Sequence, residues 1–236
     1  MSIVKIAPSI LTMDYLQIEK EIKSVENSEL ACWHLDIMDG NFVPQISFGQ
    51  DIVEKIKSIS NIPIEVHLMV ANPNDQVQKF IDIGIDRVIV HIETIDDPSE
   101  LIAITHKHNK EFALAINPET SVNTIAKYIN KLNQVTIMTV HPGFGGQKML
   151  TDCLEKIKEI KDLIQKNKFD NQINFQIDGG VKEENLELCI KAGSNNVVMG
   201  SAIFNENLDR QNTVLYLQEK IREICENYLV RINFFI

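Results

Sequence analysis

Short apolar runs alternate with longer amphipathic stretches along almost all of this 236-residue chain. The short runs are almost continuously apolar, so they predict strands that are buried on both faces of a parallel sheet. The longer stretches repeat apolar residues at helical spacing. Strands are expected at residues 4–10, 31–38, 64–70, 87–91, 112–116, 135–140, 173–177 and 196–199. Helices are expected at residues 15–25, 52–59, 77–83, 98–106, 122–129, 154–164, 183–192 and 213–228.

Eight strand–helix pairs in a chain of this length predict an α/β fold, a closed (β/α)8 TIM barrel. The alternative is an open doubly wound sheet, which would carry Gly-x-Gly-x-x-Gly after its first strand. Here Ser9-Ile10-Leu11-Thr12 follows that strand. No linker or break in composition divides the chain, so we expect one barrel domain over residues 1–228. Residues 229–236 are expected to form an apolar tail, packed beneath the barrel or in a subunit contact.

Composition excludes several classes of protein. The chain has 23 lysines and arginines against 33 aspartates and glutamates, and this acidity argues against a sequence-independent nucleic-acid binder. A local pocket can still bind a small anion. No apolar run reaches the roughly 18 residues of a membrane span, and the N-terminus lacks a signal-peptide pattern. The four cysteines include no Cys-x-x-Cys, so we expect free thiols and a cytoplasmic protein.

Polar side chains gather at the ends of three predicted strands, where barrels place their active sites. His34 and Asp36 share one face of the second strand, which ends near Asp39, while His67 and Asp178 end the third and seventh. Each of these residues alone could be structural. Together in one partly buried mouth they would be costly, and a divalent cation would compensate them. The mixture suits Zn2+, Fe2+, Mn2+ or Co2+ without selecting one, and Asp39 is expected to fix the turn.

Glycines form a second group, on three consecutive loops. His141–Gln147 follows the sixth predicted strand, Gly179-Gly180 the seventh and Gly200-Ser201 the eighth. Each glycine pair alone could be a tight turn. Together they predict a phosphate cradle, because glycine lets backbone N–H groups approach an anion closely. Only Lys148 and Lys182 lie at the edges of these loops, so backbone donors would hold the phosphate.

A cation, two carboxylates and a phosphate cradle fit a sugar phosphate as the substrate. Asp36 and Asp178 belong to strands that lie well apart around the ring, so they could work on opposite faces of one carbon. One carboxylate would remove a proton and the other would return it from the far side, which inverts the stereocentre. The C–H must be acidified by a neighbouring ketone, and the metal would stabilise the enediolate.

Six segments, which together extend over nearly the whole chain except its last residues, match one known family in order. They are Ala7–Leu11, His34–Pro44, His67–Val70, Pro142–Gln147, Asp178–Val181 and Gly200–Phe204. They resemble the ribulose-phosphate 3-epimerase family. This resemblance implies a TIM barrel of the ribulose-phosphate-binding type. It also implies conversion of D-ribulose 5-phosphate to D-xylulose 5-phosphate in the pentose phosphate pathway, by a homo-oligomer.

The resemblance also implies roles for individual residues. One divalent metal ion would be held by His34, Asp36, His67 and Asp178. Asp36 and Asp178 would form the acid/base pair, and Ser9 and His67 would touch the sugar. The residues implied to hold the phosphate and line its site are Gly143, Phe144, Gly145, Gly146, Gly179, Gly180, Gly200 and Ser201.

Some segments depart from the usual family pattern and leave the substrate open. Thr12 stands where serine is usual, and His91–Thr94 and Asn117–Thr120 resemble D-allulose-6-phosphate 3-epimerase. That enzyme performs the same chemistry between D-allulose 6-phosphate and D-fructose 6-phosphate. A phosphate-binding isomerase or lyase of a different kind would explain the glycines but give the two histidines and two aspartates no role. A non-catalytic barrel used for binding would tolerate Asp36→Asn.

Overall fold

Eight parallel strands form the centre of the molecule. The computed structural model describes residues 4–170, 172–205 and 209–233. The strands are β1 (Lys5–Pro8), β2 (Trp33–Met38), β3 (Ile64–Met69), β4 (Arg87–His91), β5 (Glu111–Ile116), β6 (Gln134–Met138), β7 (Asn174–Asp178) and β8 (Asn196–Met199). They pair in the order β1-β8-β7-β6-β5-β4-β3-β2. The predicted eight strands are therefore confirmed.

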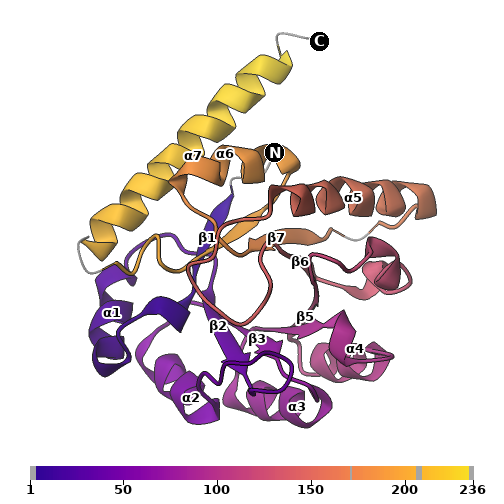
Figure 1. Ribbon diagram of the computed structural model, residues 1–236, viewed down its shortest axis with the longest axis horizontal. Coiled ribbons are helices and arrows are strands. Elements are labelled where there is room, and N and C mark those ends of the chain that lie inside the picture. The colour runs from indigo at the N-terminus through magenta and orange to yellow at the C-terminus, as the bar shows by residue number, and fades with distance from the viewer. Residues whose placement is uncertain (1–3, 171, 206–208, 234–236) are drawn as a thin grey trace.

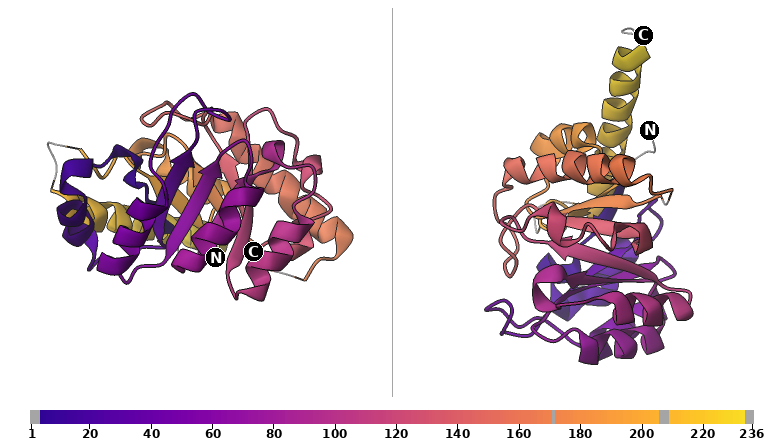
Figure 2. Two further views of the ribbon diagram at one scale, coloured as in Figure 1. Left: turned by 90° about the horizontal axis from the view of Figure 1, so that it is seen from below. Right: turned by 90° about the vertical axis from the view of Figure 1, so that its right-hand side faces the viewer.

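The first and second strands bring the ring almost to closure. The backbone N–H of Ala31 donates to the Ile6 carbonyl at 2.8 Å, and Ser9 forms a parallel bridge with His34. Figure 1 looks into the ring with helices arranged around it. Figure 2 shows the strands from the side, inside the layer of helices. The fold is the TIM barrel that the sequence predicts.

Seven α-helices surround the strands within the described part of the chain. They are α1 (Ile18–Val25), α2 (Gln50–Ile59), α3 (Asn74–Ile83), α4 (Ser99–Lys107), α5 (Glu155–Asn167), α6 (Glu183–Ala192) and α7 (Arg210–Asn233). Their apolar faces pack against the outward side chains of the strands, as Ile56 and Phe80 do, and both are fully buried. Within the described residues, no helix is both long and apolar enough to cross a membrane.

The prediction of a helix at residues 122–129 is wrong. The structure has two short 3-10 turns there, Val122–Thr124 and Ile129–Lys131. Ser121 caps the first turn: its hydroxyl accepts from the Asn123 N–H, and its carbonyl accepts from the Thr124 hydroxyl. Such local bonds compete with helix formation. The apolar residues of this segment are therefore buried from short turns and not from one face of an α-helix.

The last helix is longer than expected. It was predicted to end at residue 228, but α7 continues to Asn233, so residues 229–233 extend this helix. The remainder of the expected tail, residues 234–236, lies outside the described residues. α7 packs against α6 and α1, and its C-terminal turns project past the barrel (Figures 1 and 2).

Strand register determines which side chains face the barrel interior. In β2, Trp33 and Leu35 belong to the apolar layer under the helices, whereas His34 and Asp36 alternate with them and face inward. β2 pairs with β3 so that Asp36 lies beside His67. This register brings side chains from two strands to one level of the interior.

Candidate metal and catalytic site

Four predicted ligands meet inside the barrel. His34 and Asp36 come from β2, His67 from β3 and Asp178 from β7, and all four are buried. Each offers one nitrogen or oxygen atom, and these atoms lie within 4.8 Å of one another. The four residues were expected to meet only if the strands form a barrel, and the structure brings them together in this way.

The distances between these atoms suit a single ion. His34 Nε2 lies 3.1 Å from Asp36 Oδ1 and 3.4 Å from Asp178 Oδ2. His67 Nδ1 lies 3.1 Å and 3.3 Å from the same two oxygens. Nitrogen and oxygen ligands bind zinc at about 2.0–2.2 Å, which places neighbouring ligands roughly 3–3.5 Å apart. The residues present fit one divalent cation, and their mixed chemistry does not select its identity.

Charge in the cluster is balanced between carboxylates and imidazoles. Burial opposes ionisation of Asp36, yet His34 and His67 hold the pKa of its carboxyl well below the usual range. The pKa of Asp178 is likewise lowered against burial, chiefly by His34. Burial also opposes protonation of the imidazoles, but the two carboxylates raise the pKa of His34 and of His67. An ion bound here would take the place of these protons.

The two imidazoles present opposite nitrogens to the cluster. His34 points Nε2 inward, and its Nδ1 lies 2.7 Å from Glu65 Oε1. His67 points Nδ1 inward, and its Nε2 lies 2.9 Å from His91 Nε2. Burial lowers the pKa of His91, so its neutral ring can accept the His67 proton while its own Nδ1–H donates to Glu93 at 3.1 Å. Outer partners thus fix both rings.

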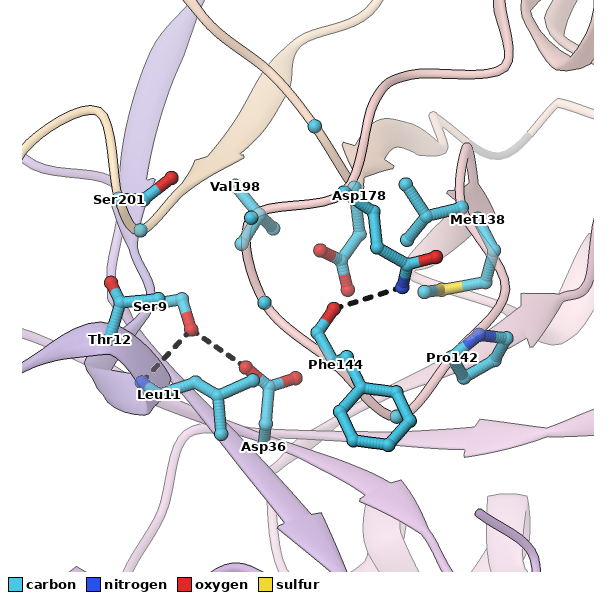
Figure 3. A pocket seen from close by; sticks show the side chains of 18 of the residues that line it. Ser9, Leu11, Thr12, Asp36, Met138, Pro142, Phe144, Asp178, Val198 and Ser201 are labelled. Carbon is cyan, nitrogen blue, oxygen red and sulfur yellow. Dashed lines mark hydrogen bonds between the residues drawn. The ribbon is translucent and has the colours of Figure 1, made fainter. Parts of the chain in front are cut away.

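Ser9 joins the cluster to the pocket above it. Its hydroxyl donates to Asp36 Oδ2 at 2.7 Å, while the Leu11 N–H donates to the same hydroxyl oxygen at 3.2 Å. Figure 3 shows these two bonds, with the Asp36 and Asp178 carboxylates turned toward one another across the pocket. Ser9 therefore occupies one oxygen of Asp36 and leaves the other to the imidazoles.

One pocket contains nearly all the residues expected to touch substrate. Asp36 and Asp178 lie in its wall. So do Ser9, Gly143, Phe144, Gly145, Gly146, Gly179, Gly180, Gly200 and Ser201. His67 is the exception: it is fully buried behind the carboxylates and does not line the pocket. In this structure its partners are Asp36, Asp178 and His91.

Glycine is required at two positions of the cradle. Gly179 has φ +121°, and a Cβ there would lie 2.5 Å from a methyl group of Val140. Gly180 has φ +65°, and a Cβ would lie 2.6 Å from the Met149 backbone nitrogen. Both glycines let the β7 loop pack directly on the β6 loop, so that the two backbones share one wall of the pocket.

Sequence reasoning missed Glu65 and placed Asp39 correctly. Asp39 fixes the turn after β2, since its Oδ1 accepts the N–H groups of Asn41 and Phe42 at 2.8 and 3.0 Å. Glu65 precedes His67 by two residues, so both share a strand face. That spacing was the available signal for an inward carboxylate.

Comparisons with known proteins identify the family. The sequence profile of the ribulose-phosphate 3 epimerase family matches residues 5–204. The chain belongs to this family. A ribulose-phosphate 3-epimerase of Bacillus subtilis is 38% identical over 212 residues, which cover 89% of this chain and 96% of that protein. One from Methanocaldococcus jannaschii is 36% identical over 220 residues, covering 93% of this chain and 92% of the relative.

Solved structures support the fold of this epimerase family member. The 3-keto-L-gulonate-6-phosphate decarboxylase of Vibrio cholerae has a TM-score of 0.68 at 15% identity, over 94% of this chain and 99% of that one. Orotidine 5'-phosphate decarboxylase from Pyrococcus horikoshii has a TM-score of 0.63 at 19% identity, over 92% and 99%. At such identities the likeness shows the barrel alone.

Proposed function

We propose that this chain interconverts D-ribulose 5-phosphate and D-xylulose 5-phosphate by moving a proton at C3. The observation that carries the proposal is the pairing of Asp36 and Asp178 across one pocket, from strands β2 and β7. The curated relatives described above are both named ribulose-phosphate 3-epimerase. Those names favour the pentulose over D-allulose 6-phosphate.

The two carboxylates are suited to opposite halves of the proton transfer. Both carboxylates line the same pocket and come from different strands, so each can act as a base toward a substrate bound between them. Asp36 would take the C3 proton on one face of the sugar and Asp178 would serve the other face. The roles reverse with the direction of reaction.

The metal ligands, the glycine loops and Ser9 would bind and orient the sugar phosphate. His34, Asp36, His67 and Asp178 would hold a divalent ion, which would supply Lewis-acid stabilisation of the negative charge that develops on the sugar. The backbone of Gly143–Gly146, Gly179-Gly180 and Gly200-Ser201 would bind the phosphate at the other part of the pocket. Ser9 would hold Asp36 in place and touch the sugar.

Solvent deuterium incorporation at C3 of ribulose 5-phosphate tests the proposal. The wild-type chain should exchange this hydrogen and form xylulose 5-phosphate, and a chelator should abolish both. Asp36→Asn and Asp178→Asn should each lower epimerisation by several orders of magnitude, since each removes one base. Asp82→Asn, on the exposed face of α3, is the matched control and should keep full activity. Absence of exchange in the wild type would refute the epimerase.

Three further expectations accompany this function. The family resemblance implies a homo-oligomer and a place in the pentose phosphate pathway, and residues 1–228 would form its single barrel domain, whose last helix α7 continues to Asn233. Mass measurement in solution tests the assembly state. Activity of the metal-free protein refilled with Zn2+, Fe2+, Mn2+ or Co2+ tests which ion supports the reaction.

A further inference from the structure

Glu65 lies directly behind the candidate metal ligand His34. The two residues face each other across the β2–β3 ladder, and the Glu65 side chain is fully buried. Its Oε1 lies 2.7 Å from His34 Nδ1 and also accepts from Gln176 Nε2. Its Oε2 accepts from Arg87 Nη1 at 2.7 Å and from Gln134 Nε2 at 3.4 Å. Four donors from four strands therefore converge on one carboxylate.

These contacts keep the carboxylate ionised and in place. Arg87 supplies a permanent positive charge to it, and Arg87 is itself bonded through Nε to Glu111 at 2.8 Å. Gln176 is fixed in turn, because its Oε1 accepts from the Thr136 hydroxyl at 2.9 Å. An ionised carboxylate that is surrounded in this way can only accept hydrogen bonds.

The orientation of the His34 proton follows from this chemistry. Since Glu65 only accepts, His34 Nδ1 must carry a hydrogen. The neutral ring then has its lone pair on Nε2, the atom that faces Asp36 and Asp178. A buried carboxylate behind an imidazole also makes the ligating nitrogen more basic.

We propose that Glu65 is a positioning residue that fixes the Nδ1–H tautomer of His34 and so presents Nε2 to the metal. The inference rests on the proposed function, because it concerns the same metal site. Glu65 touches neither the pocket nor the reacting atoms. Its effect is transmitted through His34 and is therefore expected in metal affinity as well as in turnover.

Glu65→Gln tests the proposal through metal affinity without substrate. Zn2+ affinity would be measured by competition with a chromophoric chelator. We expect Glu65→Gln to bind Zn2+ about 10–100-fold more weakly than wild type. Glu111→Gln is the matched control, since it removes the other carboxylate on Arg87 without contact to His34, and its affinity should stay within about twofold of wild type. Equal affinity in wild type and Glu65→Gln would overturn the proposal.

A second measurement needs no substitution and so does not depend on the variant folding. Nitrogen-15 NMR of the Zn2+-loaded wild type should show His34 with a protonated Nδ1 and a zinc-bound Nε2. A His34 ring bound through Nδ1 would overturn the proposal. The two proposals fail separately: a chain that binds Zn2+ through His34 Nε2 but exchanges no C3 hydrogen would refute the epimerase and leave the role of Glu65 standing.

Discussion

Replacing Arg87 with methionine is predicted to cost the metal-free protein about 3–5 kcal/mol of unfolding free energy. Arg87 joins Glu65, whose side chain is 0% exposed, to Glu111, whose side chain is 47% exposed. Methionine keeps an apolar side chain in the same place but leaves the Glu65 carboxylate with neutral donors and His34. Removing one partner of a buried ion pair typically has this cost, because the other charge is left uncompensated.

Thermal unfolding in the presence of a chelator measures the effect. At roughly 2–4 °C per kcal/mol for a chain of this size, Tm should fall by about 6–20 °C. Glu111→Gln breaks the exposed half of the same network and should cost at most about 1 kcal/mol. The double variant Arg87→Met with Glu65→Gln should be more stable than Arg87→Met alone, since the buried charge that Arg87 compensated is then also removed.

Acid pH should narrow the difference between Arg87→Met and wild type. Burial opposes ionisation of Glu65, but His34 and Arg87 hold its pKa well below the ordinary value. The stability that this carboxylate supplies is present above the unfolded pKa of about 4.3, and it is lost as pH falls toward the lowered folded pKa. Without Arg87 the folded pKa rises, so the variant loses less on acidification. If, at neutral pH, Arg87→Met lowers the unfolding free energy no more than Glu111→Gln does, the reasoning is refuted.

Two further results are expected. Zn2+ affinity of the metal-free protein should rise with pH, because the carboxylates raise the pKa of His34 and His67 and bound metal must displace their protons. Calorimetry in buffers of different ionisation enthalpy would detect the released protons. A Zn2+ affinity that does not change with pH would contradict this account. Gly179→Ala should raise KM by at least tenfold or prevent folding, since its Cβ would meet Val140 at 2.5 Å, whereas Gly49→Ala has nothing within 4 Å and should leave both KM and Tm near wild type; equal KM in the two variants would argue against close packing of the β6 and β7 loops.

Short, almost continuously apolar runs between amphipathic stretches were sufficient to predict the strands, and the polar residues at the strand ends predicted the candidate ligands. Period-two alternation placed His34 and Asp36 on one face, and the TIM barrel supplied the reason for His67 and Asp178 to meet them. The prediction of a helix at 122–129 was wrong because helices and successive buried turns can have the same apolar spacing. Local side-chain hydrogen bonds stabilise the turns here.

Glu65 escaped prediction for a different reason. The spacing to His67 indicates only that Glu65 faces inward, and its partners Arg87 and Gln176 come from distant parts of the sequence. Only the register of β3 against its neighbours makes those contacts, and the sequence pattern leaves this register undetermined. Buried polar networks are therefore harder to predict than buried ligands, which barrel architecture sends to strand ends.

One register explains both the ligands and their orientation. The β2–β3 ladder pairs Asp36 with His67, and two residues earlier it pairs His34 with Glu65. A slip of one residue would turn the polar side chains of one strand toward the helices, leaving carboxylates in an apolar layer and imidazoles without their buried partners. The same ladder that assembles the metal cluster thus also sets the His34 tautomer. Any substitution that weakens this register should lower metal affinity and stability together. Glu65→Gln keeps the register, so it should lower metal affinity more than it lowers stability.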